Sequence, residues 1–410
     1  MDLDRRQFLR GAAVGAAGTA VTGTVLLKGT EVDANAAMVA APADRYPFHG
    51  AHQSGILTPA PADKQNFACH AAFDVTAKNR QDLASAFKVL TEHARFLTTG
   101  GPPAELGVGQ PPADSAVLGP QVEADGLTVT LGVGASLFDE RFGLADHRPA
   151  KLKPMTVFPN DFLDPAWTHG DLMVQLCANH PDTVHHALRD IARATRGDLQ
   201  LRWRIDGYNS PPRPSGTSRN LLGFKDGTGN PISNDAESLV WVHDPTEPAW
   251  AVGGSYMVVR IIRMLVEFWD RVSINEQELM FGRRRDSGAP LDGNDEFDIP
   301  NYVADTEGKT IPLDAHIRLA NPRTHATENQ RLLRRSYNYD LGTDLNGNMQ
   351  SGHVFVCFQQ DMERQFETIQ QRLKDEPLVD YVQPFGGGYF YALPGVTDQN
   401  DWYARTLLGS

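Results

Sequence analysis

The sequence predicts an α+β fold made of two ferredoxin-like halves, each with the order β-α-β-β-α-β. Apolar runs of strand length alternate with two amphipathic helical stretches over residues 66–205. Weaker signals of the same kinds return over residues 255–392. A chain of 410 residues, less an N-terminal leader, suits one large domain or two intimately packed ones.

In the first half, helices are expected at residues 79–98 and 182–196, because apolar side chains recur there on one face. In the earlier helix, that face holds Leu83, Phe87 and Leu90. The expected strands are residues 66–75, 126–133, 171–178 and 199–205. Taken in chain order, these six elements make up one ferredoxin-like unit.

The second half shows the same pattern less clearly. Its expected elements are a strand at 255–265, a helix at 274–282, a strand at 353–359, a helix at 362–376 and an extended segment at 380–392. Residues 283–344 are polar with little periodicity, and a loop of this length inside a compact domain is usually functional. We predict four regions: a leader (1–36), an arm (37–64), an N-terminal domain (65–222) and a C-terminal domain (223–410).

The N-terminus reads as an export signal of the twin-arginine type. Paired Arg5 and Arg6 precede an apolar run over residues 11–27 and a small-residue cleavage site that ends at Ala36. The run is too short and too rich in glycine to favour the alternative, a membrane anchor. The sequence therefore predicts a protein of the periplasm or cell exterior, with 410 − 36 = 374 residues after cleavage. Because this route carries folded proteins, it also favours a cofactor acquired before export.

Charge and cysteine content narrow the classes of partner. With 38 Lys and Arg against 51 Asp and Glu, the net charge is −13, which argues against binding to nucleic acid or to anionic lipid. Cys69, Cys177 and Cys357 each lie in an apolar, strand-like run, so we expect buried thiols and at most one disulfide.

The stretch GFKDGTGNP, residues 223–231, places the carboxylate of Asp226 among glycines. It does not fit a dinucleotide fingerprint, since Pro231 lacks the N–H that would point at a phosphate. It is not a P-loop either, because no Lys-Ser/Thr pair follows its glycines. From the sequence alone, a turn-capping role for Asp226 is more common than a catalytic one.

The histidines give no zinc spacing. His49 and His52 lie in the arm, while His185 and His186 are neighbours on a predicted helix and point apart. His316 stands alone in the polar insertion and could be structural. A single imidazole can, however, hold haem iron, because the porphyrin supplies four further ligands. Arginines that would neutralise the two propionates follow it in the sequence: Arg318, Arg323, Arg334 and Arg335.

Three motifs in this order, GFKDGTGNP, HIRLANPR (316–323) and RRSYNY (334–339), resemble the dye-decolourising (DyP-type) haem peroxidases. The chain is most similar to their twin-arginine-exported, EfeB-like deferrochelatase branch, also in the stretches 46–59 and 158–179. The resemblance covers essentially the whole chain after the leader. It implies a duplication of the dimeric α/β-barrel type, in which two ferredoxin-like halves pack against each other. It also implies one haem b per chain, bound in the second half.

The resemblance also assigns roles to residues. Asp226 matches the distal acid, His316 the iron ligand and Arg334 the distal arginine; Arg334 is chosen over Arg335 because the family's interval of eighteen residues from the histidine falls there. The positions that match the haem-contacting loop and its neighbours are Gly227, Thr228, Gly229, Asn321, Pro322 and Arg323. Ser336 departs from branches that carry an asparagine there. The carboxylate partners considered for His316 are Asp305, Glu307 and Asp314.

The function implied is an exported haem b peroxidase that reduces hydrogen peroxide and oxidises dye-like or phenolic donors. The alternatives are a deferrochelatase, which releases iron and leaves the porphyrin intact, and a non-enzymatic haem carrier. A homodimer and partners from an iron-uptake system are further expectations. Electrons from bulky donors would pass through surface aromatics, for which Trp402, Tyr389 and Tyr391 are candidates, with core packing as the more common role.

Overall fold

The computed structural model describes residues 45–231 and 233–409. The predicted leader, its cleavage site and residues 37–44 of the arm lie outside these ranges. The strands are β1 Phe67–Val75, β2 Thr128–Gly134, β3 Leu172–Ala178, β4 Leu199–Tyr208, β5 Ser255–Met264, β6 Leu333–Arg334, β7 Tyr337–Thr343, β8 Met349–Gln359 and β9 Val382–Ala392. The helices are α1 Arg80–Thr99, α2 Pro181–Ala194, α3 Ser233–Val240, α4 Val266–Trp269, α5 Ile274–Phe281, α6 His316–Ala320, α7 Thr368–Leu373 and α8 Arg405–Leu408.

The two halves repeat one strand order, which confirms the predicted fold class. The strands lie side by side in the order β4-β1-β3-β2 in the first half and β9-β5-β8-β7 in the second. When β6 is left aside and the strands of each half are numbered along the chain, both orders read fourth, first, third and second, as in a ferredoxin-like unit. The strands are antiparallel throughout. The repeat shows that each half is one ferredoxin-like unit.

The halves join into a closed ring of strands. Because β5 pairs with both β9 and β8, the order β5-β9-β2-β3-β1-β4-β7-β8 returns to its start. The two seams between the halves are narrow: β2 pairs with β9 over Gly132–Gly134, and β4 meets β7 at the single pair Tyr208 and Asn338. The sheet is therefore continuous, while the domain boundary at residues 222 and 223 stays a prediction.

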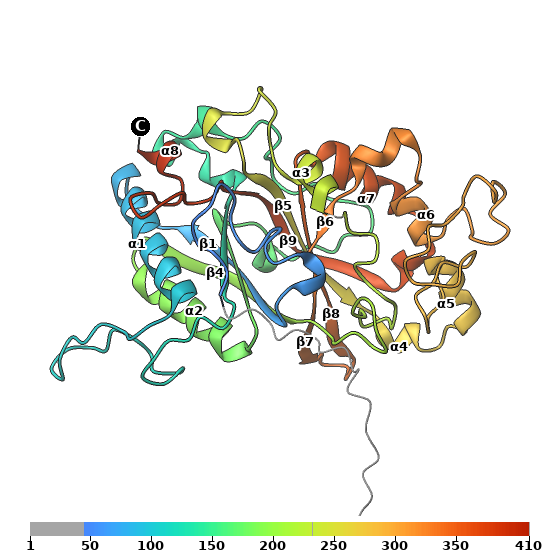
Figure 1. Ribbon diagram of the computed structural model, residues 1–410, viewed down its shortest axis with the longest axis horizontal. Helices are drawn as coiled ribbons and strands as arrows, with labels where there is room; N and C mark the ends of the chain where they lie inside the picture. The colour runs from blue at the N-terminus through green and yellow to red at the C-terminus, as the bar shows by residue number, and fades with distance from the viewer. Residues whose placement is uncertain (1–44, 232, 410) are drawn as a thin grey trace, which may run out of the picture. The chain divides into compact units, whose positions relative to one another are not determined.

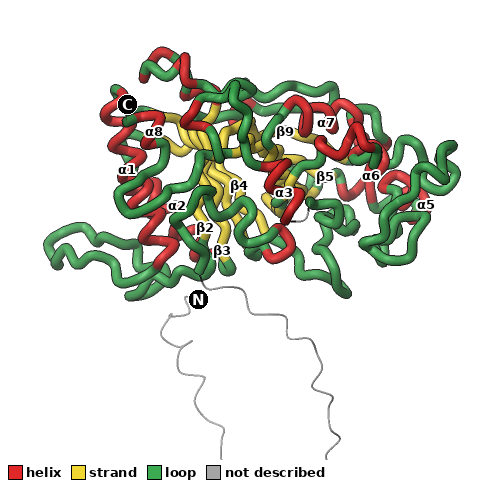
Figure 2. The backbone as a smooth tube through the Cα atoms, turned by 45° about the horizontal axis from the view of Figure 1, so that its top comes forward, coloured by secondary structure: helices red, strands yellow, loops and turns green. Residues whose placement is uncertain are grey.

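Helices lie on the outside of both halves (Figures 1 and 2). The helices α1 and α2 flank the strands of the first half, and α5, α6 and α7 lie beside the second. The buried face of α1 contains Leu83, Phe87 and Leu90, as its periodicity predicts. The predicted helix at 362–376 begins with a π-helical turn, Glu363–Glu367, and continues as α7.

The polar insertion holds more structure than its sequence pattern indicates. It contains α6, β6 and the strand β7, which completes the second ferredoxin-like unit. Only the first three residues of β7 are buried and the remaining four are exposed, so the strand has no sustained apolar alternation. The expectation of an irregular stretch over residues 283–344 was wrong for this reason.

The described part of the arm binds across one seam of the ring. The side-chain amide of Gln53 donates to the carbonyls of Leu131 and Leu393, each at 2.8 Å, and accepts the N–H of Leu131. These bonds link β2 of the first half to the segment that follows β9. The arm thus contributes to the union of the two halves.

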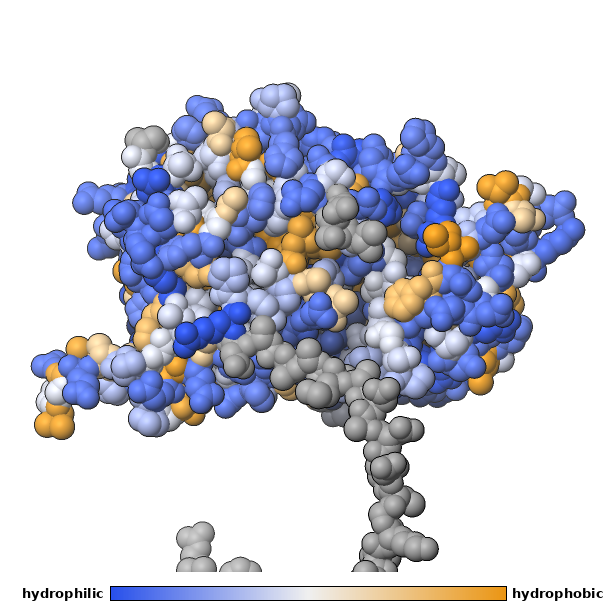
Figure 3. Space-filling model, viewed as in Figure 1, coloured by the Kyte–Doolittle hydropathy of each residue, from blue (hydrophilic) through white to orange (hydrophobic). Residues whose placement is uncertain are grey.

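The expectation for the cysteines agrees with the structure. Cys69, Cys177 and Cys357 are buried free thiols. On the face shown in Figure 3, hydrophilic residues predominate and apolar ones form scattered small spots. None of the helices within residues 45–231 and 233–409 combines the length and apolar character needed to cross a membrane.

Candidate active site

A cavity of ≈ 280 Å³ lies between the outer face of the second half's sheet and the helices α6 and α7. Side chains alternate along β5, so Arg260, Ile262 and Met264 face this cavity while Val259 and Ile261 pack inside the ring. Further walls come from the GFKDGTGNP loop, from β6 and from β8. The residues that line the cavity include Asp226, Gly227, Thr228, Gly229, His316, Ile317, Asn321, Arg323, Arg334, Ile369 and Leu373.

Asp226 lies on a tight turn at the cavity wall. Its N–H donates to the carbonyl of Ser218 at 2.9 Å, and Gly227 follows with φ +105°, a conformation that favours glycine. The carboxylate exposes 27 % of its surface and contacts Nε2 of His353 at 3.0 Å. Burial raises the pKa of Asp226, but His353, Arg334 and Lys64 outweigh it and hold the pKa well below its usual range.

Arg334 is fastened to the same loop by the side chain of Asn230. The amide of Asn230 donates to the carbonyl of Arg334 at 2.9 Å and accepts its N–H at 3.0 Å. This pair of bonds imitates one rung of a β-ladder. Because Asn230 and Asp226 belong to the same loop, these bonds hold the backbone of Arg334 next to that loop.

Arg335 points away from the cavity. Its guanidinium is fully buried and donates to the carbonyl of Pro59 and to the side chain of Gln65. Ser336 does not line the cavity either, since its hydroxyl accepts the N–H of Val356 at 3.2 Å. Successive residues of a strand face opposite sides, which explains why Arg334 and Arg335 separate.

His316 begins α6 on the opposite wall. Its Nδ1 lies 2.7 Å from Oε2 of Glu376, which leaves Nε2 as the free ring nitrogen. Burial lowers the pKa of His316, but the charge and hydrogen bond of Glu376 outweigh it and the pKa is raised. The partners considered from the sequence were wrong: Asp305 instead pairs with Arg318 and accepts loop N–H groups.

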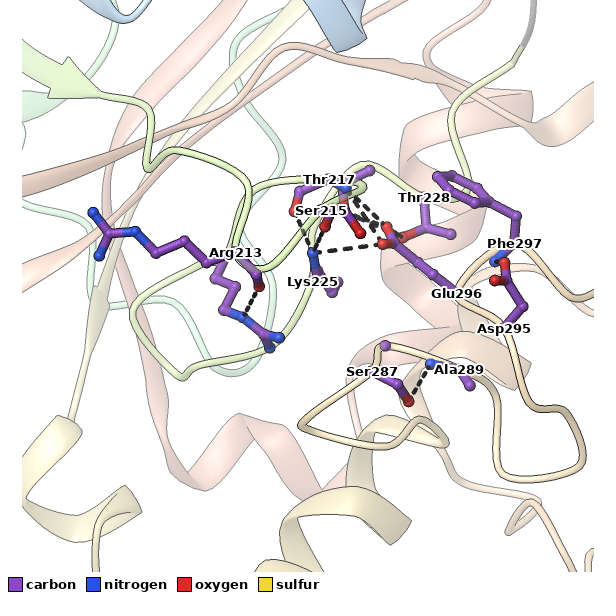
Figure 4. A network of polar contacts seen from close by, with 12 residues as sticks. Arg213, Ser215, Thr217, Lys225, Thr228, Ser287, Ala289, Asp295, Glu296 and Phe297 are labelled. Carbon is purple, nitrogen blue, oxygen red and sulfur yellow. Dashed lines mark hydrogen bonds and ion pairs between the residues drawn. The ribbon is translucent and has the colours of Figure 1, made fainter. Parts of the chain in front are cut away.

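A buried ion pair connects the GFKDGTGNP loop to the insertion (Figure 4). Lys225 and Glu296 lie 3.5 Å apart with 1 % and 8 % of their side chains exposed. The ammonium also donates to the carbonyl of Thr217, and Glu296 accepts from the hydroxyls of Thr217 and Thr228. This network ties the insertion to both sides of Asp226.

We expect Lys225→Met to destabilise the protein by about 3–5 kcal/mol, because it leaves the buried carboxylate of Glu296 without its cation. Urea unfolding of the mature chain measures this change. Lys153→Met is the matched control: Lys153 is 37 % exposed and pairs with Glu363 and Glu367, so its loss is expected to cost about 1 kcal/mol or less. Equal losses in the two variants would contradict the role of the buried pair.

Two polar atoms at the cavity have no hydrogen-bond partner within the part of the chain that the structure describes. Among the described residues, Nη1 of Arg260 and Oδ1 of Asn160 are buried without a hydrogen-bond partner, and both residues line the cavity. Arg283 also lines it, and its pKa is lowered first by burial and then by the positive charge of Arg323 and Arg334. A cluster of like charges favours an anionic ligand. Since Ile262, Met264 and Leu373 also line the cavity, an apolar group that carries carboxylates fits these features.

The other histidines and the tyrosines considered from the sequence do not line the cavity. His186 bonds Asp114, and His52 stacks on Trp241 with its Nδ1 on the carbonyl of Gly253. In residues 45–231 and 233–409, no cluster of three or more His, Cys, Asp or Glu side chains could hold a metal ion. Tyr389 and Tyr391 are buried in the core.

Of the residues to which the family resemblance assigns roles, all but Pro322 line the cavity. Arg318 and Arg335, which were considered for the propionates, do not line it. Sequence reasoning missed Glu376, His353, Asn230 and Arg283. Only Asn230 had a signal, because it belongs to the GFKDGTGNP motif.

Comparison with known proteins identifies the family. The model of the Dyp-type peroxidase C-terminal domain matches residues 217–397, and that of the N-terminal domain matches residues 53–209. The chain belongs to the DyP-type peroxidase family. The twin-arginine translocation signal sequence matches residues 2–22, so this DyP-type peroxidase is exported by that pathway to the periplasm or beyond.

Relatives of this peroxidase cover most of its length. The deferrochelatase of Yersinia pestis (strain Nepal516) is 52% identical over 372 residues, which is 89% of this chain and 85% of that protein. The crystal structure of a DyP-type peroxidase from Cellulomonas bogoriensis is 35% identical, with a TM-score of 0.80 over 90% of this chain and 100% of the other. Ferric DtpA from Streptomyces lividans is 33% identical, with a TM-score of 0.79 over 90% and 98%. The family implies haem as the cofactor.

Proposed function

We propose that this DyP-type peroxidase binds one haem b in the cavity, with His316 as the iron ligand and with Asp226 and Arg334 as the catalytic residues. It reduces hydrogen peroxide and oxidises dye-like or phenolic donors. One observation carries the proposal: an imidazole backed by a carboxylate and an acid–arginine pair line a single cavity. A haem carrier would need no such acid–arginine pair.

The residues present fit haem. Ile262, Met264 and Leu373 supply apolar walls, while Arg283 and Arg323 supply positive charge for the propionates. Haem, when bound, supplies the iron at which the O–O bond of peroxide is cleaved. Glu376 orients His316 through Nδ1, so that Nε2 would be the ligand atom, and would raise the electron-donating strength of the imidazole.

Asp226 and Arg334 move the proton and stabilise the charge. Oδ2 of Asp226 is engaged by His353, so we assign the proton transfer to Oδ1. This oxygen accepts the first proton of the bound peroxide and returns it to the departing oxygen. The guanidinium of Arg334 stabilises the negative charge that develops there, since it remains protonated throughout.

A second function, iron release from haem, is favoured by the name of the relatives that are 51–52% identical, deferrochelatase. The same side chains would serve, because both reactions begin with haem on His316. A homodimer and iron-uptake partners stay predictions.

Two assays on the mature chain distinguish these functions. With haem bound, we expect hydrogen peroxide to drive turnover of an anthraquinone dye in acidic buffer. Under anaerobic conditions without peroxide, a deferrochelatase would convert added haem to fluorescent free protoporphyrin. Porphyrin fluorescence without dye turnover would overturn the peroxidase assignment, and a chain that binds no haemin would overturn both.

A further inference from the structure

We propose that His353 is the positioning partner of Asp226 and that the two form an imidazolium–carboxylate pair. The inference rests on the proposed function, since it explains how the distal acid is held ready. His353 lies on β8 and lines the cavity, with 10 % of its side chain exposed. Its ring nitrogens both have partners, which allows the positions of its hydrogens to be worked out.

The contacts of Asn338 place a hydrogen on Nδ1 of His353. The side-chain amide of Asn338 donates through Nδ2 to the carbonyl of Arg219 at 3.0 Å and to the hydroxyl of Ser210 at 3.2 Å. A carbonyl only accepts, so the Nδ2 end of Asn338 must face Arg219. Its Oδ1 therefore faces Nδ1 of His353, at 3.4 Å. Because Oδ1 also only accepts, Nδ1 carries a hydrogen.

The other ring nitrogen of His353, Nε2, faces Asp226. Nε2 lies 3.0 Å from Oδ2 of Asp226. If Nδ1 holds the only hydrogen of a neutral ring, two lone pairs would face each other across this distance. A proton must therefore lie between the two atoms. The pair is then either imidazolium with carboxylate or imidazole with carboxylic acid.

The charges around Asp226 favour the ionised pair. His316 faces Asp226 across the cavity and would be neutral as the iron ligand. The cations beside Asp226 are Arg334 on β6 and Lys64 in the arm. Burial lowers the pKa of Lys64 to about 8, so this lysine is still largely protonated at neutral pH. Surrounded by these cations, Asp226 keeps its negative charge and the shared proton stays on His353.

The pair has a functional consequence. A proton-accepting carboxylate is effective only while it is ionised. Because the pKa of Asp226 is depressed, its charged form persists as pH falls below the usual range of an aspartate. The imidazolium also fixes the orientation of the carboxylate. His353 would thus let peroxide cleavage proceed in acidic solution.

The test substitutes His353→Gln, which preserves a hydrogen-bond donor but carries no titratable proton. We expect the peroxide reaction of the haem-loaded variant, followed by stopped flow, to lose rate as pH falls through about 4 or above, where an ordinary aspartate is protonated. The wild type should keep its rate there. His52→Gln is the matched control, because His52 lies outside the cavity and should leave the pH profile unchanged.

A second measurement needs no peroxide chemistry. In the mature chain labelled with ¹⁵N-histidine and loaded with diamagnetic zinc protoporphyrin, both nitrogens of His353 should be protonated at pH 7. Asp226→Asn should abolish this state. A neutral ring in the wild type, or an unchanged pH profile in His353→Gln, would overturn the proposal. Should the peroxidase function itself fail, the NMR result would still decide whether the pair exists.

Discussion

Mature protein that carries His316→Ala should be purified with little haem, and its Soret absorbance per chain should fall at least about tenfold. The imidazole is the one protein ligand that the proposal gives to the iron, and the other contacts of the cavity hold only the edge and faces of the porphyrin. Glu376 would remain as a buried carboxylate and would further disfavour the anionic ligand. Absorption spectroscopy after reconstitution with haemin measures the loss.

His185→Ala is the matched control for this variant. His185 is exposed on α2, far in the fold from the cavity lining, so its replacement should leave haem content unchanged. A normal Soret band at full stoichiometry in His316→Ala would remove His316 as the iron ligand.

Asp226→Asn and Arg334→Leu should each retain haem and slow the reaction with peroxide by about 10²–10³. Asparagine has nearly the shape of aspartate but cannot accept the proton, and leucine cannot stabilise the leaving oxygen. Stopped-flow measurement of the peroxide-dependent spectral change gives both rates. Because the two residues act on one step, the double variant should lose less than the product of the single losses.

An unaltered Soret band in the resting variants is the internal control, since it separates lost catalysis from lost haem. If both single variants react with peroxide at the wild-type rate while they hold haem, neither residue has the proposed role. Fully multiplicative losses in the double variant would show that the residues act independently of each other.

Much of the fold follows from local pattern. The helices α1 and α2 were predicted because each buries one continuous apolar face. The strands β1, β2 and β3 are almost entirely buried and therefore form apolar runs, whereas β4 alternates buried and exposed residues over much of its length. The strand β7 was missed because its exposed half is polar and it is held mainly by pairing with β8. Its place in the sheet depends on residues that follow it in the chain, and local periodicity does not report such pairing.

The candidate site divides in the same way. Asp226, His316 and Arg334 lie in compact motifs, so a family resemblance is enough to single them out. Glu376 follows His316 by 60 residues, and Asn230 bonds Arg334 across 104. Neither contact leaves a spacing signal, since the intervening segments set the distance in space.

The sequence by itself determined the export signal, the duplicated α+β pattern, the acidic surface and the three residues expected around the iron. Only the tertiary structure decided that Glu376 backs His316, that Asn230 bonds Arg334, and that His353 contacts Asp226. The physical reason is that hydrogen bonds and ion pairs act over a few ångströms in space, whatever the separation along the chain. Residues from β8, the insertion and the helix region before β9 are distant in the chain and come together through the packing of the second half.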